Sequence, residues 1–268
     1  MGKKNVICFL CGMLLVSVAH GQSACESLGF SPAEFITSGQ TVEDVASFDP
    51  VTGFFLDAVD WELDGVFLVD EDLLIANLEM GAMEGSVIIV QPGITLTVDI
   101  ARFFRRTTAT AMWEGIRLLP GATLIADDIT ICGAIFGIDA YNSPTVSSDF
   151  QINGVYMSND WFGNYVGLLV RAFPNAHPGS IQGIGMQGGP LISGAPGSAS
   201  FSRSGIQIDR VGDVSTGSGI TIGENTANQN VFAVLEFGIE IRKSVCEVRY
   251  CRFINGNSLN GNGVGILL

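Results

Sequence analysis

Four residues of this chain could do chemistry together on one surface. Trp113, Arg117, Asp139 and Tyr165 each lie two residues before or after a glycine that is followed by Ile or Leu. The aromatic rings could stack on sugar rings, although they could equally cover exposed strand ends. Arg117 and Asp139 could move a proton, but an inert surface ion pair is the more ordinary use of such neighbours. We therefore predict a glycan-contacting face with these four binding residues.

The same positions do not supply the paired acids of a glycoside hydrolase. Such enzymes need two carboxyl groups about 5 to 10 Å apart, which acids on neighbouring strands ~4.8 Å apart would provide. Asp139 instead has Arg117 and Leu169 at the matching positions of its neighbours. Glu236 and Glu240 share one strand but lie four residues apart, which is ~13 Å. We therefore predict no catalytic residues here.

No cofactor or metal site is predicted, and calcium is the one alternative left open. Asp60 to Gly65, with Glu71 at the twelfth position, match the calcium-loop spacing except for Glu62 at the third place. That motif requires flanking helices, whereas the residues after Gly65 read as a strand. His177 is the one histidine after residue 21, so a zinc site or a Ser-His triad lacks its parts.

A repeat must position these residues. Seven times a glycine is followed by Ile or Leu and, after one further residue, by another apolar side chain: at Gly115, Gly137, Gly167, Gly205, Gly219, Gly238 and Gly265. The residue between the apolar pair is mostly polar, as in a half-buried strand. Most intervals suit a solenoid with one coil per roughly 20 to 30 residues. Gly219 follows Gly205 too closely for a coil, so it should open a different strand.

One complete coil can be read between Trp113 and Phe136. It contains strands at 113–118, 123–126 and 129–132, a Pro-Gly turn at Pro120 and a bend at Asp127-Asp128. A second Pro-Gly turn begins at Pro92 and is followed by a similar strand, in phase with the first. Three short strands per coil are typical of a parallel β-helix. The predicted fold class is therefore all-β.

Three segments are expected along the chain. Residues 1–21 read as a secretory signal peptide, with Lys3 and Lys4 before an apolar stretch and a small-x-small cleavage site. Residues 22–65 lack the repeat and should form an N-terminal capping segment, because an uncapped solenoid end exposes strand edges and core. Residues 66–268 should form the β-helix, which we expect to be incomplete at the C-terminus because residue 268 falls within a repeat strand.

The charge balance argues against nucleic acid as a partner. After residue 21 the chain has 11 basic and 27 acidic residues, a net charge of −16, whereas phosphate binding needs a basic face. Residues 22–101 hold 15 of the acids and no Lys or Arg. A solvated acidic face that aids solubility explains this imbalance. No transmembrane segment is expected in the mature chain.

Four cysteines follow the signal segment: Cys25, Cys132, Cys246 and Cys251. An even number suits a secreted protein, but four are too sparse to build the fold of a chain this long. Cys246 and Cys251 could pair locally, and Cys132 is expected to be a buried core thiol.

Several of these motifs resemble a known class of proteins. They are Trp113-Glu114-Gly115-Ile116, the Pro-Gly-x-x-Leu turns at Pro92 and Pro120, and Phe253 to Asn257 running into Gly265-Ile266. With them, residues 66–268 resemble the secreted right-handed parallel β-helix proteins of the pectate-lyase-like class. Asp127-Asp128 is similar to the adjacent aspartates of the hydrolases of that class but lacks their Gly-His and Arg-Lys companions. A turn is therefore its expected role.

The resemblance implies a right-handed winding and two possible functions, because the class holds polysaccharide-cleaving enzymes as well as surface proteins without known activity. We expect a secreted or cell-surface, non-catalytic protein with an adhesion or glycan-contacting role, whose partner is a polysaccharide or cell-surface glycan. The alternative is an extracellular polysaccharide lyase or glycoside hydrolase. That alternative needs carboxylates assembled from loops such as Ser143 to Asn164 or Asn175 to Gly205.

Overall fold

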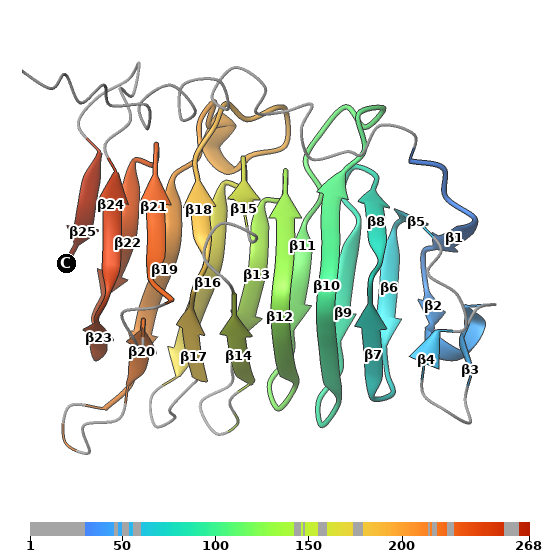
Figure 1. The fold of residues 1–268 in the computed structure, drawn as a ribbon, viewed down its shortest axis with the longest axis horizontal. Helices are drawn as coiled ribbons and strands as arrows, with labels where there is room; N and C mark the ends of the chain where they lie inside the picture. The colour runs from blue at the N-terminus through green and yellow to red at the C-terminus, as the bar shows by residue number, and fades with distance from the viewer. Residues whose placement is uncertain are drawn as a thin grey trace, which may run out of the picture.

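The computed structural model describes an all-β chain wound into a parallel β-helix (Figure 1). It describes residues 30–45, 48–49, 54–55, 60–141, 146, 148–154, 160–173, 179–213, 215, 219–223, 228–254 and 263–268. In these ranges the only helices are two 3-10 turns, η2 (Val42–Asp44) and η3 (Pro196–Ser198). No helix of the described part is long and apolar enough to cross a membrane. The predicted fold class is confirmed.

One long sheet, which we call sheet B, carries the glycine repeat. Within the described residues it has nine strands, each parallel to the next and in chain order: β2 (Gln40–Thr41), β6 (Val66–Val69), β9 (Val87–Val90), β11 (Gly115–Leu118), β13 (Phe136–Tyr141), β16 (Val166–Phe173), β19 (Ser204–Val211), β22 (Phe237–Arg242) and β25 (Val264–Leu267).

The other sheet, sheet A, is folded along its length into two columns, and β10 (Thr95–Arg105) and β12 (Thr123–Cys132) run through both. The first column also contains β4 (Phe54–Phe55), β7 (Leu73–Ala76), β14 (Asp149–Asn153), β17 (Gly179–Gln182), β20 (Ile220–Ile222) and β23 (Cys246–Val248). The second contains β1 (Glu34–Thr37), β5 (Trp61–Asp64), β8 (Glu79–Ala82), β15 (Asp160–Phe162), β18 (Gly185–Gln187), β21 (Asn230–Ala233) and β24 (Cys251–Ile254). Pairing is parallel except that β3 (Phe48–Asp49) lies antiparallel to β4.

A bend in left-handed backbone separates the two columns. Asn77, Ile100 and Asp128 occupy matching places in three successive coils, with φ values of 53°, 53° and 52°. Each such residue turns the chain from the first column into the second, so that one coil has three straight segments. The coil predicted from Trp113 to Phe136 is therefore present with its bend at Asp127-Asp128, although its first strand begins at Gly115 and its other two strands are continuous in β12.

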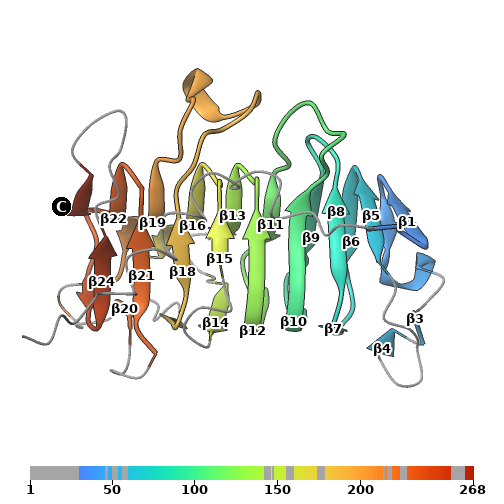
Figure 2. The same ribbon diagram turned by 45° about the horizontal axis from the view of Figure 1, so that its top comes forward.

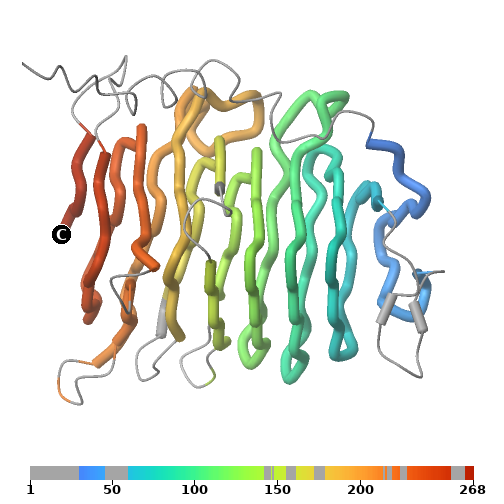
Figure 3. Tube along the Cα trace, viewed as in Figure 1, coloured from blue at the N-terminus to red at the C-terminus, as the bar shows by residue number. Residues whose placement is uncertain are grey.

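The winding is right-handed. In Figure 1 the strands of sheet A face the viewer and point upward, while successive coils advance to the left and return through sheet B behind. Figure 3 follows the same path as a tube, from the blue N-terminal coils to the red C-terminal ones.

The register between coils confirms the repeat. The first apolar residue of each unit lies opposite its counterpart in the next coil, in the order Ile116, Ile138, Leu168, Ile206, Ile239 and Ile266. Gly219 precedes β20 in sheet A, as its short interval predicted. The two Pro-Gly turns are in phase, because Thr95 pairs with Thr123.

Close approach between coils explains why the repeat needs glycine. A Cβ atom on Gly137 would lie 2.5 Å from the carbonyl oxygen of Gly167, and one on Gly167 would lie 2.6 Å from that of Gly205. A side chain there would force neighbouring coils apart. The interior between the sheets is filled by buried apolar side chains, including Trp61 and Trp161.

The two sheets begin before residue 66. Strand β1 pairs with β5, and β2 pairs with β6, so part of the 22–65 segment that we expected to form a cap already contributes to both sheets. The turn η2 follows with a capping box between Thr41 and Asp44, and Val42 is fully buried beneath it. The predicted signal peptide, residues 1–21, lies outside the described residues.

Two loops project beyond the strands where sheet A passes into sheet B (Figure 2). One joins β10 to β11, and the other joins β18 to β19 and contains η3. They meet at a bridge between Ala111 and Ser193, where the Met112 amide donates to the Ser193 carbonyl at 3.0 Å. These loops flank the start of the sheet B strands.

The cysteine predictions need correction. Cys132 is buried, as expected, but it is disulfide-bonded rather than a free thiol. Cys246 and Cys251 are free and half-buried, so the local pair that we considered is not formed in this structure. Burial raises the pKa of the Cys246 thiol to about 12 and that of the Cys251 thiol to about 11.

The bend predicts a stabilising substitution at Ile100, which is 55% exposed at φ 53°. Left-handed backbone costs a β-branched residue about 1–2 kcal/mol, whereas Asn, present at Asn77, tolerates it. Ile100→Asn should therefore raise the free energy of unfolding by about 1 kcal/mol in guanidinium titrations. Thr97→Asn, on the straight part of the same strand, is the matched control and should not stabilise. An Ile100→Asn protein no more stable than the wild type would contradict this account of the bend.

Candidate functional site on the outer face of sheet B

The structure brings Arg117 and Asp139 together, as predicted. They are register partners on β11 and β13, with the Arg117 Nε 3.7 Å from the Asp139 Oδ2. The ion pair that the sequence favoured is therefore present.

Trp113 does not lie on this face, so its predicted outward position is wrong. Its side chain is fully buried, and its Nε1 donates to the Cys132 carbonyl at 2.9 Å. The in-out alternation used for the prediction breaks at the glycine of this unit. Gly115 has a φ of 105°, which turns the chain at the corner and places Trp113 in the interior.

Tyr165 is half-buried and belongs to a different group of side chains from Asp139. Its carbonyl accepts the backbone N–H of Arg203 at 2.8 Å, and its side chain is among the groups that raise the pKa of Arg203. The four predicted binding residues are therefore divided between the core and two separate surface clusters.

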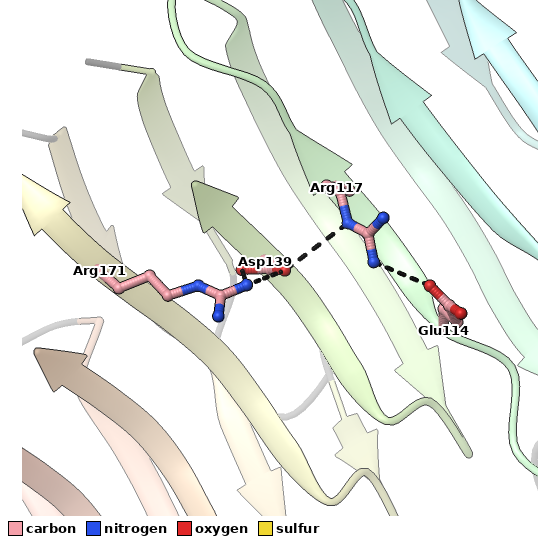
Figure 4. Close-up of polar contacts among 4 residues, drawn as sticks. All are labelled: Glu114, Arg117, Asp139 and Arg171. Carbon is pink, nitrogen blue, oxygen red and sulfur yellow. Dashed lines mark hydrogen bonds and ion pairs between the residues drawn. The ribbon is translucent and has the colours of Figure 1, made fainter. Parts of the chain in front are cut away.

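The first of these clusters, which we call the Asp139 cluster, contains Glu114, Arg117, Asp139 and Arg171 (Figure 4). Arg171 Nη2 lies 2.8 Å from Asp139 Oδ2 and 3.1 Å from Oδ1. On the other side, Arg117 Nη2 bonds Glu114 Oε2 at 2.8 Å. Asp139 itself is 2% exposed, while its two arginines keep about a third of their side-chain surface. The carboxylate thus anchors two accessible guanidinium groups.

Burial controls the protonation of Asp139. Loss of water around the carboxyl raises its pKa above the ordinary value, and this effect exceeds the opposing influence of Arg171 and Arg117. The Glu114 charge adds to the rise. The two arginines therefore offset part of the rise that burial causes in the pKa of Asp139.

Sequence reasoning missed Arg171 and the neighbouring aromatic, Tyr141. Tyr141 is 46% exposed and pairs with Arg171 in register, and the Arg171 guanidinium carbon lies 5.0 Å from its ring centroid. Both lie four residues after their glycines, one outward position beyond the row that we considered. Extending the alternation by one step would have found them.

A second group, the Glu240 cluster, lies further along the same sheet and contains Arg203, Ser204, Glu240 and Arg242. Arg203 forms a fork with Glu240, Nε to Oε2 and Nη2 to Oε1, both at 3.1 Å. Ser204 Oγ donates to the same carboxylate at 3.2 Å, and Arg242 also pairs with it. Glu240 is fully buried beneath these groups.

Glu240 differs from Asp139 in the direction of its pKa shift. Burial raises the pKa of its carboxyl, but the Arg203 hydrogen bonds and the Arg203 and Arg242 charges together bring it below the ordinary value. The same contacts raise the pKa of Arg203. The two arginines together outweigh the effect of the loss of water on the pKa of Glu240.

The two clusters are three coils apart on one continuous face. Asp139, Leu169, Gln207 and Glu240 are successive register partners, so the clusters are separated by ~14 Å at ~4.8 Å per coil. An extended ligand lying along the solenoid could contact both.

The other sequence motifs do not gather into a metal site in the part of the chain described. No group of three or more His, Cys, Asp or Glu side chains lies there in a position to hold a metal ion. In the calcium-loop match, Trp61–Asp64 form strand β5, and Glu62 pairs with Arg106 at 3.3 Å. Asp127 accepts from Asn153 Nδ2 at 2.9 Å at the bend, in keeping with a turn role. His177 lies outside the described residues, as do parts of the loops that an enzyme would need.

Comparison with known proteins adds no family to this description. No protein-family model matches the chain, and neither a curated protein nor a solved structure matches it.

The Glu240 cluster makes a pH-dependent prediction. A carboxyl whose pKa is lowered in the folded state stabilises the protein above its unfolded pKa, and this contribution is lost as the pH falls through the folded value. Glu240→Gln should lower the free energy of unfolding at pH 7 by about 1–3 kcal/mol, because it leaves Arg203 without a charged partner. The difference from the wild type should shrink as the pH falls below about 4.

Denaturant titrations at several pH values measure this difference. Glu236→Gln is the matched control, since Glu236 is exposed just before the same strand, and it should change stability little. A Glu240→Gln deficit that stays constant down to pH 3 would show that the Glu240 charge does not supply the stabilisation.

Proposed function

We propose that this protein binds a polysaccharide or cell-surface glycan through the outer face of sheet B and acts as a secreted or cell-surface, non-catalytic adhesion protein. The observation that carries the proposal is the exposed Tyr141 ring beside Arg171, whose guanidinium is held by the buried Asp139. An aromatic face next to fixed polar groups is the arrangement that sugar rings and hydroxyls need.

Preorganisation supports a binding role. Arg171 is held by Asp139, and Arg117 is held by both Asp139 and Glu114, so neither side chain has to be ordered when a ligand arrives. The cluster holds two basic and two acidic side chains, a balance that suits a ligand recognised through hydroxyl groups more than through charge.

The regular surface supports an extended ligand. Successive coils present their outward side chains at ~4.8 Å intervals, and the Glu240 cluster lies ~14 Å from the Asp139 cluster on the same face. A polymer has repeating groups that could use such a surface, whereas a single sugar would contact one cluster.

The alternative function is a polysaccharide lyase or hydrolase, because the sequence motifs resemble the pectate-lyase-like class, which contains such enzymes. On this face the two buried carboxylates, Asp139 and Glu240, are each engaged by two arginines. A general acid or base must reach the substrate, so these contacts favour binding over cleavage. Release of soluble sugars from a bound polysaccharide would establish the enzyme instead.

Tyr141→Ala tests the proposal. A glycan array followed by titration with the tightest ligand should show binding that weakens at least tenfold in this variant, about 1.4 kcal/mol, because the stacking surface is removed. Tyr250→Ala is the matched control, since Tyr250 is 43% exposed but lies at the bend between β23 and β24 of sheet A, and it should bind as the wild type does. Absence of glycan binding by the wild type, or equal binding by Tyr141→Ala, would refute the proposed site.

A further inference from the structure

An outward strip on the second column of sheet A is buried although it is not part of the core. Phe104 on β10 and Cys132 on β12 are register partners and are 0% and 3% exposed. The residues just before them, Phe103 and Ile131, belong to the core cluster. Because successive side chains of a strand point to opposite faces, Phe104 and Cys132 face outward. A part of the protein outside the core must therefore cover this strip.

The segment before β1 covers Phe104. The Phe30 ring lies edge-on to the Phe104 ring with the centroids 5.0 Å apart, and the Arg106 guanidinium carbon lies 4.6 Å from the Phe30 centroid. Arg106 in turn pairs with Glu62, with the Arg106 Nη1 3.3 Å from the Glu62 Oε2. A Cβ atom on Gly81 would lie 3.0 Å from the Phe30 ring, so the glycine leaves room for that ring. Phe30 therefore docks in a fitted site on the outer face of the sheet.

The place of Phe30 shows which way the chain crosses this face. Strand β1 is outermost, and β5, β8, β10 and β12 follow it in order. Phe30 contacts residues of β8 and β10, which lie two and three strands inward of β1, or ~10–14 Å at ~4.8 Å per strand. The chain from Phe30 to Glu34 must therefore run nearly along the solenoid axis. Continued backward from Phe30, the same path leads to β12, which carries Cys132.

The disulfide bond of Cys132 is an independent observation at the same place. The chain has six cysteines: Cys8, Cys11, Cys25, Cys132, Cys246 and Cys251. Cys132 is disulfide-bonded, whereas Cys246 and Cys251 are free thiols. Two of the remaining three lie in residues 1–21, the predicted signal peptide. Cys25 is then the partner left for Cys132 in the mature chain.

We propose that residues 22–29 lie along the outer face of the second column of sheet A and that Cys25 forms the disulfide bond with Cys132. The chain from Cys25 to Phe30 spans up to ~17 Å when extended, whereas Cys132 lies one strand, ~4.8 Å, from Phe104. The bond forms when the two thiols give up two protons and two electrons to a small disulfide such as oxidised glutathione, which leaves as two thiols. The N-terminal segment is then a covalent strap that fastens the outermost coil to β12.

Such a strap protects the N-terminal end of the solenoid. A terminal coil has a neighbour on one side only, so a solenoid opens most easily from its ends. The bond between Cys25 and Cys132 closes a loop of roughly 100 residues, which restricts the unfolded chain. Stability should therefore depend on the redox state of the surroundings, as suits a protein exported to an oxidising compartment. This inference is independent of the proposed glycan binding.

Peptide mapping of the full chain under non-reducing conditions tests the pairing. The protein is produced in an oxidising compartment, alkylated in denaturant and digested. Mass spectrometry should find a linked pair of peptides that contain Cys25 and Cys132. A Cys132 bound to any other cysteine, or alkylated in the oxidised protein, would overturn the proposal.

Thermal unfolding measures what the strap contributes. Reduction should lower the melting temperature of the wild type by at least about 5 °C, and Cys25→Ser should show the lower value with or without reductant. Cys246→Ala is the matched control, since Cys246 is a free thiol, and it should keep the wild-type loss on reduction. A Cys25→Ser protein that still loses stability on reduction would contradict the assigned pair.

Phe30→Ala tests the docking that brings Cys25 to Cys132. Without the ring the segment is held less firmly on this face, so the equilibrium constant for forming the bond in a glutathione redox buffer should fall at least tenfold. Phe35→Ala is the matched control, since Phe35 is 58% exposed on β1, and it should leave that constant unchanged. Equal constants for the wild type and Phe30→Ala would contradict the docked strap.

Discussion

In-register parallel pairing between coils is the constraint on which this structure depends. Each coil must place an apolar residue over the one before, and the chain must come close enough that only hydrogen fits at Gly137 and Gly167. Because the interior positions are fixed in this way, the outward positions are stacked as well. Arg117, Asp139 and Arg171 come from three different coils and become one cluster for that reason alone.

The two arginine–carboxylate clusters show how neighbours decide the state of a buried acid. Asp139 and Glu240 are both removed from water, yet the pKa of Asp139 rises and that of Glu240 falls. The difference lies in their partners, because Glu240 receives two hydrogen bonds from Arg203, Nε to Oε2 and Nη2 to Oε1, and also pairs with Arg242. Glu240 is therefore a stabilising contact, whereas Asp139 serves mainly to hold two arginines at the surface.

The fold could be predicted from the sequence because the spacing of the glycine units follows from the pairing of successive coils. The glycine units, the separate role of Gly219 and the bend at Asp127-Asp128 were all readable from spacing. The prediction that the Trp113 side chain points outward was wrong, because the in-out alternation does not continue through Gly115, which has a positive φ. Cys132 could not be assigned either, since disulfide pairing depends on which distant segments meet.

A double-mutant cycle between Asp139 and Arg171 tests the central claim most directly, because the two residues touch only if the coils stack in this register. Unfolding free energies of Asp139→Asn, Arg171→Met and the double variant should give a coupling energy of about 1 kcal/mol or more. The same cycle between Asp139 and the distant Arg252 should be additive within about 0.5 kcal/mol. Additivity in the Asp139 and Arg171 cycle would contradict the stacking on which the site and its proposed function rest.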